Sequence, residues 1–424
     1  MPKVKVPVNK QLNKSDNVIK TIEYPSTVNE GKKYKYTFWS NKPVKQFNEN
    51  IINSNIIEDL TQRKVYASDE PITLPSSLEW INVNLKDELM MNKVVEFLQL
   101  YYLPDEQDKF IPVYSTSFIK WMLGITGFLI AIVSKSNSTI CGVVGGMVKT
   151  MTVFDKTEKF GSVKFLCALP LYRKKKIAYT LIDESVRRLV KLGVKQGYFV
   201  TERCVPSPVT TIRYYDRPIN YIKLQKIKYI DIGGEPEKVQ TKFDLKTSVS
   251  HNYVEMTKEH IEMVYVLYNK YIVKYNVYIQ YTQTELETLL LNECVNSYVV
   301  LDNNNVVDFI SYYKLTYNVI GSDEKINTGV LFLYTCINKA CDEMVENILK
   351  FAKINELDLF TVNDTMMIRD VLFTKDYTIE EESDIESYDR VFEHKFIRST
   401  KTLHLNYFNW KCPTMKSNQV SIII

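Results

Sequence analysis

Residues Val163 to Arg188 read VKFLCALPLYRKKKIAYTLIDESVRR, and this stretch decides the fold. An apolar run is followed by a short connection, a cluster of basic residues and a second apolar pattern. In the second pattern, from Lys174 onward, the apolar residues recur at helical spacing, at Ile177, Leu181, Ile182, Val186 and Leu189. Gly193 stands where a left-handed helix C-cap is expected. The stretch therefore predicts a strand that leads into a helix with one buried face.

Four basic residues, Arg173, Lys174, Lys175 and Lys176, cover the turn and the first residues of that helix. The helix dipole disfavours cations at this end, whereas a bound anion would meet both the free backbone N–H groups and the basic side chains. The pattern thus indicates a phosphate site. A solvated basic face is the alternative, and for a lysine run taken alone it is the commoner explanation.

The same residues resemble the acyl-CoA-binding segment of the N-myristoyltransferases, two-lobed relatives of the GNAT-type acetyltransferases. Phe165-Leu166-Cys167 matches the family's FLC, and RKKKIA, from Arg173 to Ala178, matches its RxKRVA. The resemblance implies that the loop and helix N-terminus hold the CoA pyrophosphate. It also assigns KYTFWSNKPV, from Lys35 to Val44, as a cover over the acyl-CoA, although an aromatic staple on the core is an alternative. The implied acyl-CoA residues are Tyr36, Thr37, Phe38, Trp39, Phe165, Leu166, Cys167, Ala168, Arg173, Lys174, Lys175, Lys176, Ile177 and Ala178.

A peptide groove is implied by two further matches. YYLPDEQDKFIPVYSTSFIKW, from Tyr101 to Trp121, resembles a family segment that lines the groove, and it carries over Tyr102, Phe110 and Tyr114. CVPSPVTTIRYYDRPINYIKLQKIKY, from Cys204 to Tyr229, resembles a second, which carries over Tyr214. Thr201 matches the threonine that helps to place the incoming amine. We therefore expect these aromatic side chains to line the path of a peptide.

Composition excludes several classes of protein. The 424 residues are 45% hydrophobic and 12% aromatic, which is enough for two globular cores. A net charge of +4 gives no general case for nucleic-acid binding, and no apolar run reaches the length of a transmembrane helix. The 7 scattered cysteines predict a reducing cytoplasm, which would be the host's if the A+T-biased composition reflects a large DNA virus. We expect no metal or prosthetic group, and we expect the protein to be a monomer.

The chain divides at Gly233-Gly234-Glu235-Pro236, after which the plan of strands and helices repeats. We expect a flexible arm at 1–30, an acyl-CoA-binding lobe at 31–232 and a peptide-binding lobe at 237–424. The fold class is α/β with a mixed sheet: two tandem acetyltransferase-like lobes form a pseudo-symmetric saddle around a central cleft. In the second lobe Asn338 to Asp342 replace the basic turn, so only the first lobe is expected to hold CoA.

The chain closes with YFNWKCPTMKSNQVSIII, which resembles the family's YxYNWKCPSMxxxxVGLVL. Termini usually fray in water, yet Val420 and the three final isoleucines favour burial. A free α-carboxylate has a pKa of about 3.5, and a dry pocket raises it toward that of a usable base. The resemblance assigns this role to the carboxylate of Ile424, which takes a proton from the glycine ammonium, and assigns the oxyanion site to the backbone N–H groups of Phe165 and Leu166.

Several signatures differ from the family. Leu169 and Pro170 replace the His and Lys of EINFLCxHK, and Asp216 replaces a His. KFIRSTK, from Lys395 to Lys401, replaces KFGxGDG, after an acidic insertion at Glu380 to Arg390. Thr361 replaces an Asn, Thr316-Tyr317 replaces a Pro-Ser pair, and Ile111-Pro112 replaces an Arg-Phe pair. The segment between Thr201 and the prolines of CVPSPV is one residue shorter than in the family. The differences cluster on the peptide side.

Three functions therefore stay open. The first is a protein N-myristoyltransferase, in which myristoyl-CoA is the co-substrate and N-terminal-glycine proteins are the acceptors. The second is a non-catalytic acyl-CoA or acyl-peptide binding protein that retains the fold. The third is an acetyltransferase-like enzyme for another acyl chain. The ending at an apolar carboxylate favours the first, because a non-catalytic protein has less need of it.

Overall fold

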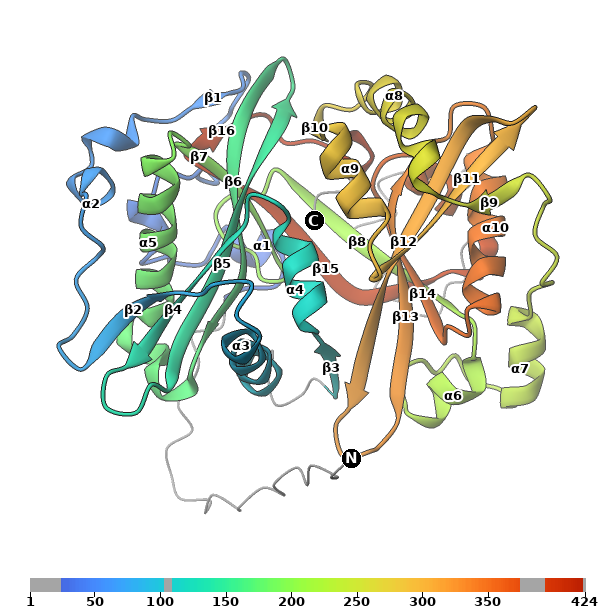
Figure 1. The fold of residues 1–424 in the computed structure, drawn as a ribbon, viewed down its shortest axis with the longest axis horizontal. Coiled ribbons are helices and arrows are strands. Elements are labelled where there is room, and N and C mark those ends of the chain that lie inside the picture. The colour runs from blue at the N-terminus through green and yellow to red at the C-terminus, as the bar shows by residue number, and fades with distance from the viewer. Residues whose placement is uncertain (1–23, 103–108, 374–392, 422–424) are drawn as a thin grey trace.

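One continuous, twisted sheet of 14 strands runs through both halves of the computed structural model, which describes residues 24–102, 109–373 and 393–421 (Figure 1). In sheet order the main strands are β2 (Leu78–Asn82), β4 (Phe128–Ser134), β5 (Ile140–Val153), β6 (Lys156–Ala168), β7 (Gln196–Thr201), β15 (Ile397–Phe408), β8 (Thr210–Pro218), β14 (Leu359–Asn363), β13 (Lys325–Tyr334), β12 (Asn305–Val319), β11 (Val295–Asp302) and β9 (Tyr253–Glu255). At its sides, β10 (Val277–Gln280) pairs with β5 and β3 (Phe110–Val113) pairs with β12. A separate pair joins β1 (Asn55–Ile56) to β16 (Trp410–Lys411).

Helices cover both faces of the sheet. They are α1 (Val28–Gly31), α2 (Lys64–Ala67), α3 (Glu88–Tyr101), α4 (Thr116–Leu123), α5 (Ile177–Lys191), α6 (Tyr221–Lys226), α7 (Pro236–Phe243), α8 (Ile261–Ile272), α9 (Gln283–Leu290), α10 (Cys341–Ile354) and α11 (Ile368–Leu372). Helix α5 packs on one face of β5 and β6, while α3 and α4 pack on the opposite face. In the second half, α8, α9 and α10 pack around β11 to β14. No described helix is long and apolar enough to cross a membrane.

The predicted strand, turn and helix are confirmed, with one correction at the turn. Helix α5 buries Ile177, Leu181 and Leu189, and it ends before Gly193, whose φ is 77°. It starts at Ile177 rather than Lys174, because Lys176 adopts a left-handed conformation with φ 61°. Arg173, Lys174 and Lys175 therefore lie in a 3-10 turn, and Lys176 connects this turn to the first turn of α5.

Both halves contain the predicted parallel crossover. In the first, β6 leads through α5 into β7, and the two strands pair in parallel from Phe160–Gln196 to Ser162–Tyr198. In the second, β13 leads through α10 into β14, with parallel pairs from Thr328–Leu359 to Val330–Thr361. Each ladder holds three pairs before its strands part. The predicted repeat of a mixed-sheet lobe is thus confirmed.

The two halves interlock rather than sit side by side. Strand β15, from near the end of the chain, lies between β7 and β8, and β8 continues the sheet into β14. The expected linker is a tight bend in which Gly233 and Gly234 have φ 75° and 87°, and α7 begins at Pro236. The assignment of residues 31–232 and 237–424 as separate lobes stays a prediction. The arm before Tyr24, the acidic insertion at 380–390 and Ile422 to Ile424 lie outside the described residues.

Candidate active site

The centre of the site is a bulge in β6. Strand β5 pairs with β6 at Gly145–Lys164 and again at Val143–Cys167, so that Phe165 and Leu166 have no partner residue in the ladder. Phe165 has φ 55°, a conformation that costs free energy for any residue but glycine. On the other side of β6 the ladder with β7 has already ended at Ser162. The backbone at Phe165 and Leu166 is therefore not engaged in strand pairing.

The N-terminus of α5, at Ile177, follows the end of β6, at Ala168, after a short connection, and no side chain caps it. The first N–H groups of a helix have no intrahelical partner, so those of α5 are available to an anion. Lys175 lies in the adjoining 3-10 turn, with its Nζ 5.0 Å from the centre of the Tyr172 ring. Lys174 is in the same turn, and Lys176 is its left-handed last residue.

The guanidinium of Arg173 donates hydrogen bonds to backbone carbonyls. Its Nη2 donates to the Tyr101 carbonyl at 3.0 Å, and its Nε donates to the Ala168 carbonyl at 3.3 Å. These bonds connect the turn to the end of α3 and to the end of β6. In this position Arg173 fixes the turn, and the side chains of Lys175 and Lys176 are exposed.

The segment Tyr36 to Trp39 packs against the opening of α5 and the end of β7. The Phe38 ring stacks on the Tyr179 ring, with centroids 4.1 Å apart and an interplanar angle of 7°. The Trp39 ring stacks on the Phe199 ring at 5.1 Å, and the Tyr36 hydroxyl donates to the Cys204 carbonyl at 2.9 Å. Thr37 is exposed between them. The segment thus lies over α5 and β7, where the resemblance places the acyl-CoA, although part of it also forms a small core, as the aromatic-staple alternative expects.

Cys167 and Ala168 form the buried wall beyond the bulge. The Cys167 side chain belongs to the core under α3 and α4, and burial raises the pKa of its thiol to about 12. A thiol with such a pKa stays protonated at neutral pH and is a poor nucleophile. Cys167 is therefore suited to contact the acyl group, and it is not suited to attack it.

Two of the predicted groove residues meet at the bulge. The Tyr114 ring lies 5.5 Å from the Phe165 ring and 6.0 Å from the Tyr102 ring, measured between centroids. Tyr214 stands on β8 nearby, and burial raises the pKa of its hydroxyl above 10. Phe110 lies elsewhere: it is on β3, which pairs with β12, and its ring contacts Tyr229 at 4.8 Å. Phe110 therefore lines a more distant part of the region between the lobes.

Thr201 is the last residue of β7. It stands three residues beyond the last β6–β7 pair, Ser162–Tyr198, just as Phe165 does on β6. The Thr201 hydroxyl donates to the Arg203 carbonyl at 2.6 Å, which leaves its lone pairs free to accept a hydrogen bond. A threonine oriented in this way can accept from an incoming ammonium group.

Two of the residues that differ from the family contact each other. Asp216 on β8 is opposite Thr361 on β14, and the Thr361 hydroxyl donates to the Asp216 carboxyl at 2.6 Å. The Tyr229 hydroxyl donates to the other carboxyl oxygen at 3.4 Å. Burial raises the pKa of Asp216, which is only 4% exposed. Asp216 and Thr361, which replace a His and an Asn of the family, thus form a hydrogen-bonded pair.

Sequence patterns did not single out Lys164, which directly precedes Phe165. Its partner in the ladder is Gly145, and a Cβ built on Gly145 would point at Leu123 of α4, so Lys164 faces the α4 side of the sheet. Burial, and after it the charge of Lys149, lowers the pKa of Lys164 to about 7. A half-buried lysine next to the bulge could have been found only from the register of β5 and β6.

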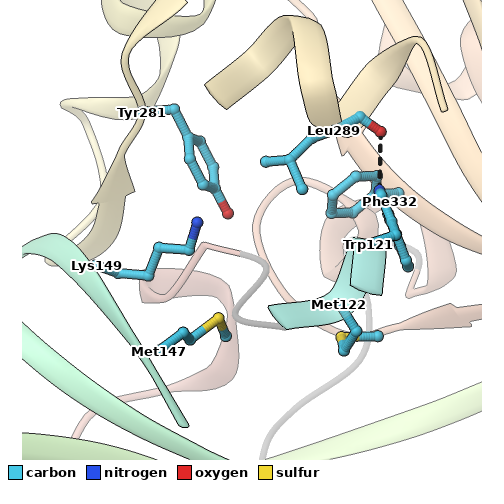
Figure 2. Close-up of a pocket in the computed structure, with 7 residues that line it drawn as sticks. All are labelled: Trp121, Met122, Met147, Lys149, Tyr281, Leu289 and Phe332. Carbon is cyan, nitrogen blue, oxygen red and sulfur yellow. Dashed lines mark hydrogen bonds between the residues drawn. The ribbon is translucent and has the colours of Figure 1, made fainter. Parts of the chain in front are cut away.

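The same face of β5 lines a small hollow between the lobes, shown in Figure 2. It encloses about 290 Å³ of empty space, part of it open to solvent. Lys149 points across it toward Tyr281 and forms an ion pair with Glu285 at 3.3 Å, while the Trp121 indole N–H donates to the Leu289 carbonyl at 3.1 Å. The hollow is lined by Trp121, Met122, Met147, Lys149, Tyr281, Leu289 and Phe332.

In the second lobe, a carboxylate fills the turn that corresponds to the α5 turn. Asp308, fully buried on β12, accepts hydrogen bonds from the backbone N–H groups of Ile337, Asn338 and Lys339 at 2.7 to 2.8 Å. It also accepts from the Thr335 hydroxyl at 2.9 Å. The Asp308 carboxyl therefore satisfies the N–H groups of this turn, whereas no side chain caps the N-terminus of α5.

The described part of the chain ends at a buried position between the lobes. Val420 forms a parallel bridge with Val277, and the Ser421 N–H donates to the Val277 carbonyl at 2.8 Å. Val277 belongs to β10, which pairs with β5 of the first lobe. Both Val420 and Ser421 are at most 1% exposed. Ile424 itself lies outside the described residues.

This fold is shared with solved acyltransferases of known ligand. One Saccharomyces cerevisiae N-myristoyltransferase structure, with bound myristoyl-CoA, matches with a TM-score of 0.81 and 21% sequence identity over 92% of this chain and 99% of that one. A second, also with bound myristoyl-CoA, matches with a TM-score of 0.79 and 22% identity over 91% and 90%. These likenesses establish that the chain shares the fold of these two structures.

The family follows from the sequence. Residues 56–212 match the model of the myristoyl-CoA:protein N-myristoyltransferase N-terminal domain, and residues 230–422 match that of its C-terminal domain. The chain belongs to this family. A probable glycylpeptide N-tetradecanoyltransferase of Caenorhabditis elegans is 28% identical over 94% of this chain and 88% of that protein. A glycylpeptide N-tetradecanoyltransferase of Dictyostelium discoideum is 25% identical over 98% of both.

Proposed function

We propose that this chain transfers myristate from myristoyl-CoA to the N-terminal glycine amine of proteins. The observation that carries the proposal is the unpaired backbone at Phe165 and Leu166, set where β6 and β7 part and close to the uncapped N-terminus of α5. A thioester carbonyl at the bulge and a pyrophosphate at α5 would both meet free N–H groups. The described backbone therefore suits both ends of an acyl-CoA.

The acyl-CoA would lie along the open edge of β6. Ile177 and Ala178 would present their backbone N–H groups to the pyrophosphate, while Lys174, Lys175 and Lys176 supply charge. Tyr36 to Trp39 would cover the cofactor from the side of Tyr179 and Phe199. Arg173 would hold the turn in shape through its bonds to backbone carbonyls.

The reaction needs one base and one oxyanion site. The glycine ammonium would donate a hydrogen bond to the Thr201 hydroxyl and lose a proton to the carboxylate of Ile424. The free amine then attacks the thioester carbonyl, and the N–H groups of Phe165 and Leu166 stabilise the oxyanion. Collapse of the tetrahedral intermediate forms the amide and releases CoA as its thiolate, which takes up a proton. Ser421, three residues before Ile424 in the sequence, is buried between the lobes, which supports this role for the terminus.

We also infer that one copy of the chain acts alone in the cytoplasm. Both predicted substrate regions are formed by segments of one chain that pack around a single continuous sheet, so that a second copy is not required. All seven cysteines are free, which suits a reducing compartment. Sedimentation of the purified chain and fractionation of cells that produce it test these two inferences.

The transfer is tested with myristoyl-CoA and a panel of peptides that begin with glycine, analysed by mass spectrometry. Matched peptides that begin with alanine, or whose glycine is acetylated, are the controls. We expect myristoylation of free glycine termini alone. If the protein binds myristoyl-CoA yet modifies no peptide, it is a non-catalytic acyl-CoA binding protein and the proposal fails.

A further inference from the structure

The cover segment, Lys35 to Val44, meets α5 at two places that lie one helical turn apart. The Phe38 ring stacks on the Tyr179 ring. The Lys42 Nζ atom forms an ion pair with the Oδ1 atom of Asp183. Tyr179 and Asp183 are four residues apart on α5, so their side chains lie on one face of the helix. One aromatic contact and one charged contact therefore join the cover segment to the same face of α5.

The ion pair is shielded from water and has a third partner. The side chains of Lys42 and Asp183 are only 12% and 22% exposed. The Tyr66 hydroxyl, from α2, donates to the Asp183 carboxylate at 2.8 Å and accepts from Lys42 Nζ at 3.2 Å. Exposed ion pairs contribute little because water and salt screen them, and screening is weaker where both charges are largely covered. This contact is therefore stronger than an ordinary surface ion pair.

Lys42 also contacts the stacked rings. Its Nζ lies 4.6 Å from the centre of the Phe38 ring, within the range of a cation–π contact. The Phe38 ring in turn lies 4.1 Å from the Tyr179 ring and nearly parallel to it, at 7°. Pro43 follows Lys42, and the Lys42 backbone is extended, with φ −104° and ψ 152°, as expected before a proline. The backbone and the ring contact thus hold Lys42 where it reaches Asp183.

This ion pair is the charged link between the cover segment and its surroundings. Among the described residues, no other ion pair joins the segment to the rest of the chain. The ring stack of Trp39 and the hydrogen bond of Tyr36 are uncharged. A ligand held beneath such a segment enters and leaves only when these contacts separate. Because a charge-assisted hydrogen bond is about twice as strong as a neutral one, the ion pair is expected to offer the main resistance to opening.

We propose that Lys42 and Asp183 are positioning residues that hold the cover segment closed over a bound acyl-CoA. They act through the segment rather than on the thioester: their ion pair keeps Phe38 against α5 and thereby sets the rate at which the acyl-CoA leaves. The inference rests on the acyl-CoA site of the proposed function and deepens it, because it assigns retention of that ligand to two residues of this chain. Retention requires no acceptor peptide, so it can be measured apart from transfer.

The test follows dissociation of a radiolabelled, non-hydrolysable thioether analogue of myristoyl-CoA after a chase with the unlabelled analogue. The native chain is compared with Asp183→Asn, Lys42→Glu, Asp183→Lys and the double variant that combines the last two substitutions. We expect each single substitution to speed dissociation by about tenfold, because it removes a shielded charge-assisted contact. The double variant exchanges the two charges, and it should return dissociation to within about threefold of the native rate.

Asp69→Asn is the control, because Asp69 forms an ion pair with Lys191 in the last turn of the same helix. This variant should keep the native dissociation rate. The amount of analogue bound at saturation gives the folded fraction of each protein, so that a loss of folding is not mistaken for faster release. Single substitutions that leave the rate unchanged overturn the proposal, as does a double variant that releases the analogue as fast as the single variants do.

Failure of the transfer reaction would be seen separately. If the native chain retains the analogue but acylates no glycine-initiated peptide from myristoyl-CoA, the proposed transfer is wrong, and the dissociation rates still decide the role of the ion pair. A native chain that does not bind the analogue at all would refute both the proposed function and the retention of acyl-CoA by Lys42 and Asp183.

Discussion

At the scale of single residues, two ionisable groups of the candidate site are shifted toward their neutral forms. Asp216 is buried and Lys164 is half-buried; burial raises the pKa of Asp216 and lowers that of Lys164. Asp216 is partly compensated by hydrogen bonds from Thr361 and Tyr229. Such groups reduce stability at neutral pH, and they are found where a surface is shaped for a ligand.

Replacing Asp216 by asparagine tests the cost of this buried carboxyl. The folded protein holds the Asp216 proton more tightly than the unfolded chain does, so Asp216 lowers stability as pH rises above about 4. We expect Asp216→Asn to raise the free energy of unfolding by about 1 kcal/mol at pH 7, with the gain disappearing below about pH 4. Urea denaturation at both pH values measures the difference. Asp155→Asn, at an exposed carboxylate, should show no such gain, and an equal gain at both pH values would contradict the assignment.

The residues that sequence reasoning identified, and those that it missed, differ in a physical way. Tyr102, Tyr114 and Phe165 belong to sequence segments that resemble the family, and their rings contact one another in the structure. Lys164 stands beside these residues in the sequence, but no pattern assigned it a role. Its position depends on the register of β6 against β5, which the bulge at Phe165 and Leu166 interrupts.

At the scale of elements, the two turns that lead from strand to helix distinguish the lobes. The α5 turn has no side-chain cap and carries lysines, whereas the α10 turn encloses the Asp308 carboxylate. The periodicity of the apolar residues predicted α5 and its end at Gly193. It could not reveal the left-handed Lys176, because no glycine or asparagine marks that conformation in the sequence.

Lys176→Gly separates the strain of the α5 turn from its charge. Glycine adopts the left-handed conformation without the steric cost of a Cβ, so the free energy of unfolding should rise by about 0.5 to 1 kcal/mol. Loss of the cation should weaken CoA binding by a factor of about 3. Thermal unfolding and titration calorimetry with CoA measure the two effects. Lys175→Ala should weaken binding without the gain in stability; a Lys176→Gly variant that is less stable than the native protein would refute the account.

Asp308→Ala tests the internal anion of the α10 turn. The substitution leaves the N–H groups of Ile337, Asn338 and Lys339 without their acceptor in a buried position. We expect the free energy of unfolding to fall by about 3 kcal/mol. Denaturant melts of this variant and of Asp302→Ala, at an exposed turn, provide the comparison. A loss no greater than that of the control would show that Asp308 does not hold the turn together.

At the scale of the whole molecule, one sheet joins two similar halves. The repeat of strands and helices was visible in the sequence, since each half carries its own alternation of apolar patterns. The insertion of β15 between β7 and β8 was not, because Leu405 and Val200 are partners although about half of the chain separates them. The same is true of Val420 beside Val277. Local patterns predict elements, and long-range pairing decides which residues share the cleft.

The most direct measurement compares single-turnover transfer of myristate to a glycine-initiated peptide by the native chain and by a variant with two alanines added after Ile424. Both proteins are first shown to bind myristoyl-CoA with equal affinity, so that folding and cofactor binding are controlled. If the carboxylate of Ile424 is the base, the extended variant should transfer at least about 100-fold more slowly. Equal rates for the two proteins would contradict the account.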